Sequence, residues 1–524
     1  MVDVIIIGSG AAGTAAALAL AGRGIRPLLL DAGYTDAGRT ARVEGNLYDY
    51  RKRHDSFDLQ IGADFRGLSD VLEDRVGVAK LNAPNAAFVT EGAERLGPVL
   101  AEDFDPIQSF ARGGLANAWG AGLYRFVQAD LAGFPIRLAD LAPYFDRLTA
   151  EIGISGADDD LTPYFGDPAG LLPALALSHN AGLVYRIYRR QRATFGRQGI
   201  AIGRPRVGVL SAAKDGRPAC DYNNTEFWQD SPYLYTPVIT LNRLIAADRV
   251  AYRPGVLVRS WAEQHDGVTV EGTDVSTGEP FRFVGQKLLL AAGAINTTRI
   301  VLQSRRDYGV RLTLLDNPAV QIPFVLPASL GRRLDTTAFG LTQLNLIWES
   351  PVHGLLQGSI IELTSPMRAE FFGRFPLSAR ANLQLVRTML PAMLLMQLFF
   401  PGAVQEPAAV SLLEDGRLRI QGHPNPVEIR QLGPLLRRLR SVGLWTLPML
   451  IYKPVTGHAI HYAGTLPMRE TPKQYECDPT GKLSGTERVY IADSACFSAL
   501  PAKNMSFGMM ANAMRVATHA TQNT

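Results

Sequence analysis

Residues 2–22, VDVIIIGSGAAGTAAALALAG, predict how the chain begins to fold. The run carries almost no charge and is nearly long enough for a membrane span or the apolar core of a signal peptide. Against both interpretations, Asp3 stands where a signal peptide carries basic residues, and glycines interrupt the run after a short strand. A second apolar strand follows and ends in an acid, Asp31. Strand, glycine turn, helix, strand and acid in this order predict a dinucleotide-binding βαβ unit.

Each glycine of this unit has its own expected role. Gly8 makes the tight turn, Gly10 lets the backbone approach a pyrophosphate, and Gly13 permits close packing of the helix on the strand. The N-terminus of the helix then offers free N–H groups and a positive dipole end to the phosphates. Asp31 is placed to accept hydrogen bonds from ribose hydroxyls. NAD and FAD share this unit, so it predicts a nucleotide cofactor without deciding which one.

The composition is that of an ordinary globular protein. The chain has 524 residues, 47% hydrophobic and 19% charged, enough for one large domain or two closely joined ones. Its 53 Lys and Arg against 49 Asp and Glu give a net charge of +4 with no long basic tail, so we expect no nucleic-acid partner. Cys220, Cys477 and Cys496 lie far apart without CxxC spacing. This excludes a disulfide framework and a cysteine-built zinc site, and fits a reducing, cytoplasmic location.

Residues 241–306 contain a predicted β-meander that is followed by a second glycine-containing turn. Short alternating strands with turns at residues 266–267 and 277–278 lead into a buried run, KLLLAAG, and then into a helix from about Asn296. This order resembles the second half of two-dinucleotide-type flavoproteins, in which the turn at Ala292 and Gly293 passes the cofactor, and so favours FAD. Val258 stands where such proteins place an adenine contact, although plain strand packing would also explain it.

Residues 109–122, SFARGGLANAWGAG, predict a loop whose backbone approaches another group. Small and turn-forming residues around a single tryptophan suit neither a helix nor a long strand. A flavin is the candidate neighbour, and a glycine-rich surface loop is the alternative.

Two polar residues near the C-terminus are the candidate catalytic pair. Because Pro467 follows His461 so closely, no helix runs through it, which removes a helical metal pair with His458. On a strand the two histidines would point to opposite sides, so we expect one to face a site and His458 to be structural. An imidazole near its usual pKa is a natural general base for an alcohol proton. Asn504 opens the last helix and is expected to serve as its N-cap.

Five motifs occur in order along the chain: the βαβ unit, the GG..N.WG loop, AAGAINTTRI, HYAGTLPM and the ADS…P..N segment. In this order they resemble the glucose-methanol-choline (GMC) oxidoreductase superfamily, and more loosely its bacterial pyranose and glycoside oxidase branch. The resemblance implies an α/β fold, α+β overall. A Rossmann-like FAD-binding domain with a β-meander would be joined to a substrate domain built on a large antiparallel sheet with helices. It also implies oxidation of a C–OH group by hydride transfer to flavin N5.

The resemblance assigns roles to individual residues. His461 would be the catalytic base and Asn504 would hold the substrate oxygen. The N–H groups of Met505 and Ser506 would face the flavin N1–C2=O edge, and Asp493 would contact the ribityl chain, although a bare Asp there is more often a turn former. Ala118 stands where covalently flavinylated relatives carry a histidine, so FAD is predicted to be noncovalent. The remaining expected cofactor contacts are Gly8, Gly10, Ala11, Gly13, Asp31, Ala32, Arg112, Gly113, Gly114, Asn117, Trp119, Gly120, Val258, Ala292, Gly293 and Ser494.

The chain is expected to alternate between the two domains. Residues 1–45, 95–150, 200–317 and 455–524 are assigned to the FAD domain, and residues 46–94, 151–199 and 318–454 to the substrate domain. Alternating apolar runs between residues 318 and 424 predict one antiparallel sheet that roofs the flavin.

Two segments of the substrate domain allow several interpretations. Residues 388–401, TMLPAMLLMQLFFP, are too short to span a bilayer and predict a core helix, an apolar substrate entrance or a monotopic membrane contact. Five arginines between residues 186 and 197 are at helical spacing and are either solvated or suited to an anionic substrate.

The expected substrate is a small molecule, most simply a sugar or glycoside alcohol, with a lipophilic alcohol such as a sterol as the alternative. A lyase with a redox-idle flavin and a flavin-binding accessory protein are the competing classes. The electron acceptor, O₂ or a quinone or protein, is left open, as is the oligomeric state.

Overall fold

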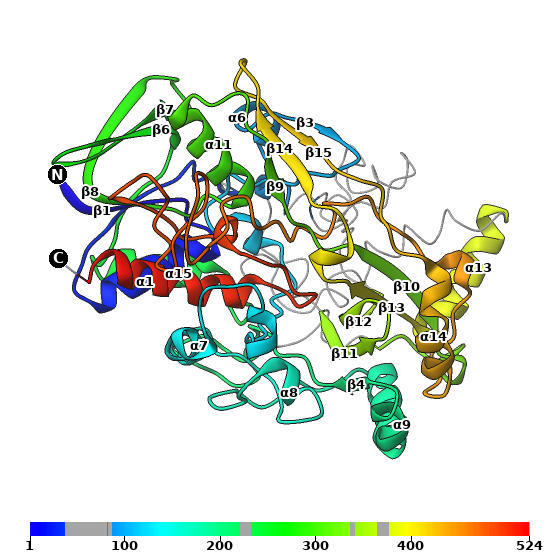
Figure 1. Ribbon diagram of the computed structural model, residues 1–524. Helices are drawn as coiled ribbons and strands as arrows, with labels where there is room; N and C mark the ends of the chain where they lie inside the picture. The colour runs from blue at the N-terminus through cyan, green and yellow to red at the C-terminus, as the bar shows by residue number, and fades with distance from the viewer. Residues whose placement is uncertain (37–80, 82–85, 221–231, 336–340, 364–376, 523–524) are drawn as a thin grey trace.

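The N-terminal βαβ unit forms as predicted and lies in the centre of one half of the molecule (Figure 1). The computed structural model describes residues 1–36, 81, 86–220, 232–335, 341–363 and 377–522, so most of the predicted 46–94 segment lies outside the described residues. Strand β1 (Val2–Ile7) leads into helix α1 (Ala11–Gly22) and then strand β2 (Leu28–Leu30).

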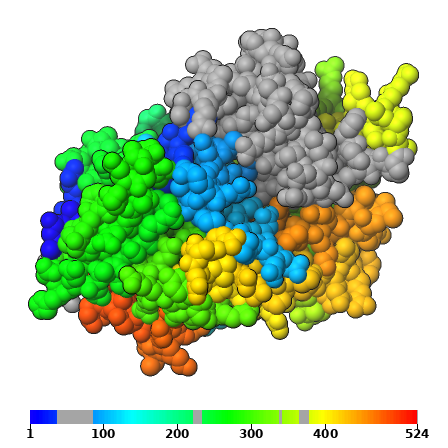
Figure 2. Space-filling view, turned by 90° about the horizontal axis from the view of Figure 1, so that it is seen from above, coloured from blue at the N-terminus to red at the C-terminus, as the bar shows by residue number. Residues whose placement is uncertain are grey.

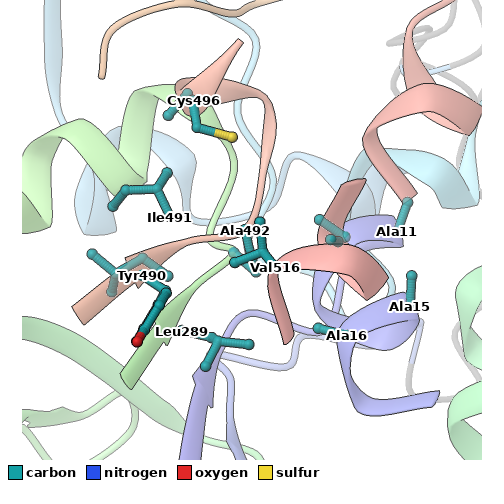
Figure 3. Packing of buried hydrophobic residues seen from close by; sticks show 14 of the residues in the cluster. Ala11, Ala15, Ala16, Leu289, Tyr490, Ile491, Ala492, Cys496 and Val516 are labelled. Carbon is teal, nitrogen blue, oxygen red and sulfur yellow. The ribbon is translucent and has the colours of Figure 1, made fainter. Parts of the chain in front are cut away.

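Helix α1 is apolar on every side because it is covered on every side. All its residues from 11 to 21 are buried, and its long-range neighbour is the last helix, α15 (Ser506–Ala520). Ala11, Ala15 and Ala16 of α1 and Val516 of α15 belong to one buried cluster (Figure 3). Because these side chains are small, the two helices approach closely, and the C-terminal segment is thereby held against the cofactor-binding unit.

A seven-stranded sheet brings four parallel strand ends to one edge. Its order is β5-β2-β1-β8-β7-β6. Strand β16 also pairs with β8, at the end of β8 that lies beyond its pairing with β7. Ile7, Leu30, Leu290 and Ile491 are in register across β1, β2, β8 and β16. The residues that follow them therefore share one rim, where open α/β sheets bind ligands. The added strands are β5 (Ala251–Arg253), β6 (Val256–Gln264), β7 (Gly267–Asp274), β8 (Pro280–Leu290) and β16 (Val489–Ile491).

The β-meander prediction is confirmed. Strands β6, β7 and β8 pair antiparallel, with their turns at the predicted positions. Helix α11 (Ala294–Arg305) follows β8 and begins two residues before the predicted start.

The second half of the molecule is built on a five-stranded antiparallel sheet, in the order β10-β13-β12-β11-β4. One face packs on α9 and α14 through residues such as Leu394, Met396 and Leu398. The opposite face is turned toward the seven-stranded sheet, and the predicted fold class is thus confirmed. The elements are β4 (Ile200–Gly203), β10 (Ala319–Val325), β11 (Thr342–Ser350), β12 (Gly354–Glu362), β13 (Met393–Phe399), α9 (His179–Gly196) and α14 (Gly433–Arg440).

Two predictions for the substrate half were wrong. The core helix predicted over residues 388–401 is instead the strand β13, which pairs with β10 and β12. Both faces of this strand are covered, so its sequence is an unbroken apolar run that periodicity cannot separate from a buried helix. The single sheet predicted over residues 318–424 is in fact two. Strands β14 (Ala408–Leu412) and β15 (Leu418–Gln421) join β3 (Val99–Glu102) and β9 (Leu312–Leu314), and lie beside the β3 segment in Figure 2.

The remaining helices lie around these sheets. They are α6 (Ala93–Leu96), α7 (Leu138–Ile152), α8 (Thr162–Phe165), α10 (Pro237–Ala246) and α13 (Ala379–Met389). Among the helices in the described part of the chain, none combines the length and the apolar composition needed to cross a membrane. Both chain termini lie at one end of the molecule, and α9, α13 and α14 lie at the other (Figure 1).

Candidate functional site

A large cavity opens at the shared strand rim and extends to the five-stranded sheet. Its walls come from segments far apart in the sequence, including the β1–α1 turn, the 109–122 loop, the β8–α11 turn and the C-terminal segment. Most of the predicted site residues line it: Gly8, Gly10, Ala11, Asp31, Ala32, Gly114, Ala118, Trp119, Gly120, Val258, Ala292, Gly293, His461, Asp493, Ser494, Asn504, Met505 and Ser506.

The glycines test whether a dinucleotide fits here. A Cβ built on Gly10, Gly120 or Gly293 would meet no protein atom within 4 Å, and all three residues border the cavity. A Cβ on Gly13 would instead lie 1.9 Å from the Gly8 carbonyl oxygen. Gly13 therefore serves the packing of α1, whereas Gly10 leaves open space in front of the helix N-terminus, as bound phosphates require.

Asp31 is buried behind this turn. The hydroxyl groups of Ser9 and Tyr252 both donate hydrogen bonds to its Oδ2, the second over 3.1 Å. Burial raises the pKa of the Asp31 carboxyl to about 6, and these hydrogen bonds oppose the rise. Asp31 also lines the cavity, so its carboxylate borders the space in front of the turn. Neither Ser9 nor Tyr252 was predicted as a partner of Asp31.

The 109–122 loop is irregular, as predicted, and is tied to the βαβ unit. The Gly113 N–H donates to Ser9 Oγ over 2.9 Å, and the Asn117 side chain donates to the carbonyls of Arg112 and Gly114 over 2.8 and 2.9 Å. The Arg112 guanidinium lies over the Tyr252 ring, 4.9 Å from its centroid. Four predicted cofactor contacts, Gly13, Arg112, Gly113 and Asn117, thus do not line the cavity and instead hold its wall in shape.

His461 is buried at the cavity, and its protonation pattern follows from its partner. Its Nδ1 lies 3.0 Å from Oδ1 of Asn317. The Asn317 Nδ2 donates to the carbonyls of Phe400 (2.7 Å) and Pro501 (3.1 Å), which fixes the amide with its oxygen toward the ring. Nδ1 must therefore carry the hydrogen, and Nε2 keeps a lone pair. Burial lowers the pKa of His461 to about 4, so the ring is neutral at pH 7.

Asn317 was not predicted. It is 144 residues away from His461 in the chain, and nothing in its local sequence marks it. The Phe399 ring also packs on His461, with centroids 5.2 Å apart.

The prediction that only one histidine could face the site was wrong. His458 and His461 both line the cavity, because the segment between them is a turn and not a strand. Ile460 has a φ of 60°, which redirects the chain between the two residues. His458 differs from His461 in its partner, since its Nδ1 lies 3.3 Å from a carboxylate oxygen of Asp105.

Asn504 lies just before α15 but does not cap it, contrary to the prediction. The helix begins at Ser506, the residue before it is Met505 in helical conformation, and no side chain caps the helix end. The Asn504 carboxamide lies instead against the loop, where its Nδ2 is 2.7 Å from the position of a Cβ on Gly122. The preceding residue, Lys503, is anchored by a buried ion pair with Asp130. This leaves the Asn504 side chain free of helix capping and placed at the cavity.

Asp493 joins two parts of the rim. It accepts hydrogen bonds from Gly293 N (2.9 Å), Thr297 Oγ1 (2.5 Å) and Ala495 N (2.9 Å), and burial raises its pKa to about 6. It therefore cross-links the β8–α11 turn to the end of β16, besides lining the cavity.

A row of neutral polar side chains crosses the cavity-facing side of the five-stranded sheet. Gln321, Gln397 and Ser359 are in register on β10, β13 and β12, and all three line the cavity. The row continues on β11 with Asn345, which is within 3.0 Å of the Tyr124 hydroxyl. None of the described cavity-lining residues from these strands is charged, and none of the arginines between residues 186 and 197 lines the cavity. These residues were not predicted as a group, because they are far apart in the sequence and become neighbours only when the strands pair in this register.

Family models match the two ends of the chain. An FAD binding domain model covers residues 3–70, and a GMC oxidoreductase model covers residues 447–513, the segment that holds His461 and Asn504. The chain belongs to the GMC oxidoreductase superfamily. It is an FAD-dependent alcohol oxidoreductase that acts on CH–OH groups.

Solved structures share the fold of this GMC oxidoreductase over its whole length. Pyridoxine 4-oxidase from Mesorbium loti is 14% identical, with 99% of each chain covered and a TM-score of 0.59. Formate oxidase from Aspergillus oryzae RIB40, in a variant made to examine FAD modification, is 14% identical with a TM-score of 0.62; 99% of this chain and 98% of that chain are covered. No curated protein sequence matches the chain.

Proposed function

We propose that this GMC oxidoreductase oxidises a secondary alcohol of a neutral sugar or glycoside, with His461 as base and Asn504 as the donor that holds the substrate oxygen. The observation that carries the first assignment is the Asn317–His461 hydrogen bond, which leaves Nε2 unprotonated in a ring that burial keeps neutral. Asn504 borders the same cavity and is not needed by α15.

The cavity residues suit FAD. Gly10 leaves room for a pyrophosphate, and Asp31 borders the cavity with a carboxylate that can accept from ribose. The first N–H groups of α15, at Met505 and Ser506, lie at the cavity with the positive end of the helix dipole. When bound, FAD accepts a hydride from the carbon that bears the hydroxyl group. Asp493 already serves three protein donors, so we propose that it mainly holds the β8–α11 turn in place and touches the ribityl chain only secondarily.

The two catalytic side chains divide the remaining work. His461 Nε2 accepts the hydroxyl proton, and its Nδ1–H stays with Asn317 so that the ring does not rotate. The Asn504 Nδ2 donates a hydrogen bond to the substrate oxygen as negative charge develops on it. Because the site is buried, these polar interactions are stronger than they would be in water.

The polar row supports a sugar as the substrate. Gln321, Gln397 and Ser359 offer both donors and acceptors in a line, which matches several hydroxyl groups on one molecule. A charged substrate would find no counter-charge among the described cavity residues of these strands. A lipophilic alcohol is the second candidate because apolar side chains flank the row, namely Ile361, Leu395 and Phe399.

Anaerobic stopped-flow absorbance in the visible flavin band tests this proposal. Neutral pyranosides should bleach the flavin faster than sterols of equal concentration, and Gln397→Leu should raise KM for pyranosides at least about tenfold, because a buried hydrogen-bonding group is lost. Leu398→Val, next to Gln397 on β13 but on the opposite face of the sheet and outside the cavity lining, is the matched control and should leave KM unchanged. Faster bleaching by sterols would favour the second candidate. Turnover without any bleaching would indicate a lyase with an idle flavin.

We further propose that FAD is bound without a covalent link, since Ala118 lines the cavity and offers no nucleophilic side chain. Precipitation of the purified protein with acid should release the cofactor, which leaves a colourless pellet and a yellow supernatant. A pellet that retains the yellow colour after washing in denaturant would contradict this.

A further inference from the structure

An exposed apolar loop lies at the end of the molecule opposite the termini. Residues 445–450, WTLPML, follow α14 and end in a short 3₁₀ turn. The side chains of four of the six residues are large, apolar and exposed: Trp445 by 51%, Leu447 by 56%, Met449 by 83% and Leu450 by 44%. Apolar side chains scattered singly over a surface are ordinary, but four within six residues form a patch that indicates an interaction.

Neighbouring segments extend this apolar loop into a surface. Trp445 pairs with Val325 at the end of β10 through two backbone hydrogen bonds of 2.8 and 3.0 Å. After β10 the chain reaches Leu330, which is 45% exposed. The N–H of the next residue, Gly331, donates to the carbonyl of Thr388 in α13. Helix α13 has apolar residues on one side, yet among its described residues only Asn382 is buried. Figure 1 shows α13 and α14 at this end, and the hydrogen bonds place the loop and Leu330 beside them.

The same end is strongly basic. Residues 177–199, 326–334, 377–390 and 437–455 contain no Asp or Glu, although the whole chain has a net charge of only +4. Side chains join α9 to α14, since the Arg438 guanidinium lies 5.4 Å from the centroid of the Phe195 ring. The Arg440 guanidinium lies 5.5 Å from the Trp445 ring centroid. The basic residues of these segments are Arg186, Arg189, Arg190, Arg192, Arg197, Arg332, Arg333, Arg380, Arg387, Arg437, Arg438, Arg440 and Lys453.

Three described acids near these segments have partners of their own. Asp160 pairs with Arg192, Glu428 pairs with Arg430, and Asp335 accepts the His179 N–H over 3.0 Å. Of these contacts between described residues, the ion pair of Asp160 with Arg192 is the one that involves a member of the basic set, and it neutralises a small part of its positive charge.

We propose that this end docks on an anionic lipid surface, with residues 445–450 inserted among the headgroups and the surrounding arginines on the lipid phosphates. Tryptophan and leucine on a protruding loop suit the membrane interface, where aromatic and aliphatic side chains bury area while flanking basic residues meet anionic headgroups. An apolar groove on another protein would match the apolar loop alone. An anionic lipid surface also matches the basic residues, which come from four segments around the loop. Among the described residues no helix spans a membrane, so the contact would be peripheral.

Docking in this way would turn the substrate half of the enzyme toward the membrane. The Gln321 N–H donates to the carbonyl of Tyr452 over 2.9 Å, so the same loop continues directly into the cavity wall. A reaction at the membrane surface would follow, whichever alcohol is the substrate.

Co-sedimentation of the FAD-loaded full-length protein with vesicles tests the proposal. We expect binding to phosphatidylcholine vesicles that contain phosphatidylglycerol, much weaker binding to pure phosphatidylcholine, and release at high salt. The double variant Leu447→Asp, Met449→Asp should bind at least about tenfold more weakly, because each acid would have to enter the interface. Arg332→Glu with Arg333→Glu should weaken binding by a similar factor. Neither variant touches the catalytic cavity, so flavin content and turnover of a soluble substrate should not change.

A matched control and an optical measurement keep the result specific. Tyr308→Asp replaces an exposed residue that follows α11, outside the segments of the docking surface, and should not affect sedimentation. Trp445 fluorescence should shift to the blue on addition of anionic vesicles, and Trp445→Phe should remove that shift. Absence of binding to anionic vesicles at low salt, or equal loss with Tyr308→Asp, would overturn the proposal. Binding that survives the Leu447→Asp, Met449→Asp change would also overturn it, since some other surface would then be responsible.

Discussion

Replacement of His461 by alanine is expected to slow flavin reduction by a factor of about 10²–10⁴, the usual cost of a lost general base. The imidazole is buried at the cavity, and its hydrogen bond to Asn317 leaves Nε2 unprotonated. The other histidine at the cavity, His458, lies beside a carboxylate and not an amide. Anaerobic stopped-flow under saturating substrate measures the effect on the chemical step. The flavin content of the variant should equal that of the native enzyme.

His519→Ala is the matched control, because this histidine is in the last turn of α15, outside the cavity lining, and its ring hydrogen-bonds to Gln522. It should leave the rate of flavin reduction unchanged. A His461→Ala enzyme that reduces its flavin at nearly the native rate would show that the proton leaves by another route, and the proposed role of His461 would be wrong.

The pH dependence gives a second test of the same base. Burial lowers the pKa of His461 to about 4, so the proton-accepting form is fully present above about pH 5 and is lost only as the pH falls through 4. The acid limb of kcat/KM should therefore lie near 4 and not near the ordinary histidine value of about 6.5. Asn317→Asp should shift this limb to higher pH, because a carboxylate on Nδ1 stabilises the charged ring. A merely structural role of Asn317 would lower stability without moving the limb.

The cofactor half could be predicted from sequence because its determinants are local. Gly8, Gly10, Gly13 and Asp31 fall within one short stretch, and each is specified by a backbone conformation or a close approach that few other residues allow. Residues that line the rim also follow directly from strand order, since parallel strands end at one edge. What was missed here, such as Tyr252, is a partner of Asp31 brought in by a separate strand.

The substrate half was predicted less well because its determinants are long-range. The strand β13 has apolar residues on both faces, since one face packs on helices and the other borders the cavity, so its sequence has no period that distinguishes strand from helix. The polar row of Gln321, Gln397 and Ser359 depends on the register of three strands. The sequence of a single strand does not determine its register with the others. Asn317 and His461 likewise meet only in the folded chain.

The predicted helix cap failed for a related reason. An asparagine before a helix is a good N-cap in isolation, but at Asn504 the preceding Lys503 is fixed by a buried ion pair, and the helix begins two residues later. Tertiary anchoring thus overrode a local preference and left the side chain at the cavity. Departures of this kind are expected where a residue has a functional task.

The last prediction separates the two roles assigned to glycines of the first turn. Gly13→Ala should destabilise the protein even without FAD, because the new Cβ would lie 1.9 Å from the Gly8 carbonyl oxygen and 3.0 Å from its carbon. These are backbone atoms, so α1 must move away from the β1 turn, and overpacking of this kind costs about 3 kcal/mol or more. The melting temperature of the cofactor-free protein should fall by several degrees, as measured by calorimetry.

Gly10→Ala is the matched substitution, since the same methyl group at Gly10 would meet no protein atom within 4 Å and its φ of −63° suits alanine. We expect the cofactor-free protein to melt within about a degree of the native one, while the Kd for FAD rises at least about tenfold, because the methyl group occupies the space that the backbone leaves for a pyrophosphate. Equal loss of cofactor-free stability in both variants would mean that Gly10 also serves packing. Unchanged FAD affinity in Gly10→Ala would place the pyrophosphate elsewhere, and the assignment of the β1–α1 turn as the phosphate site would then be wrong.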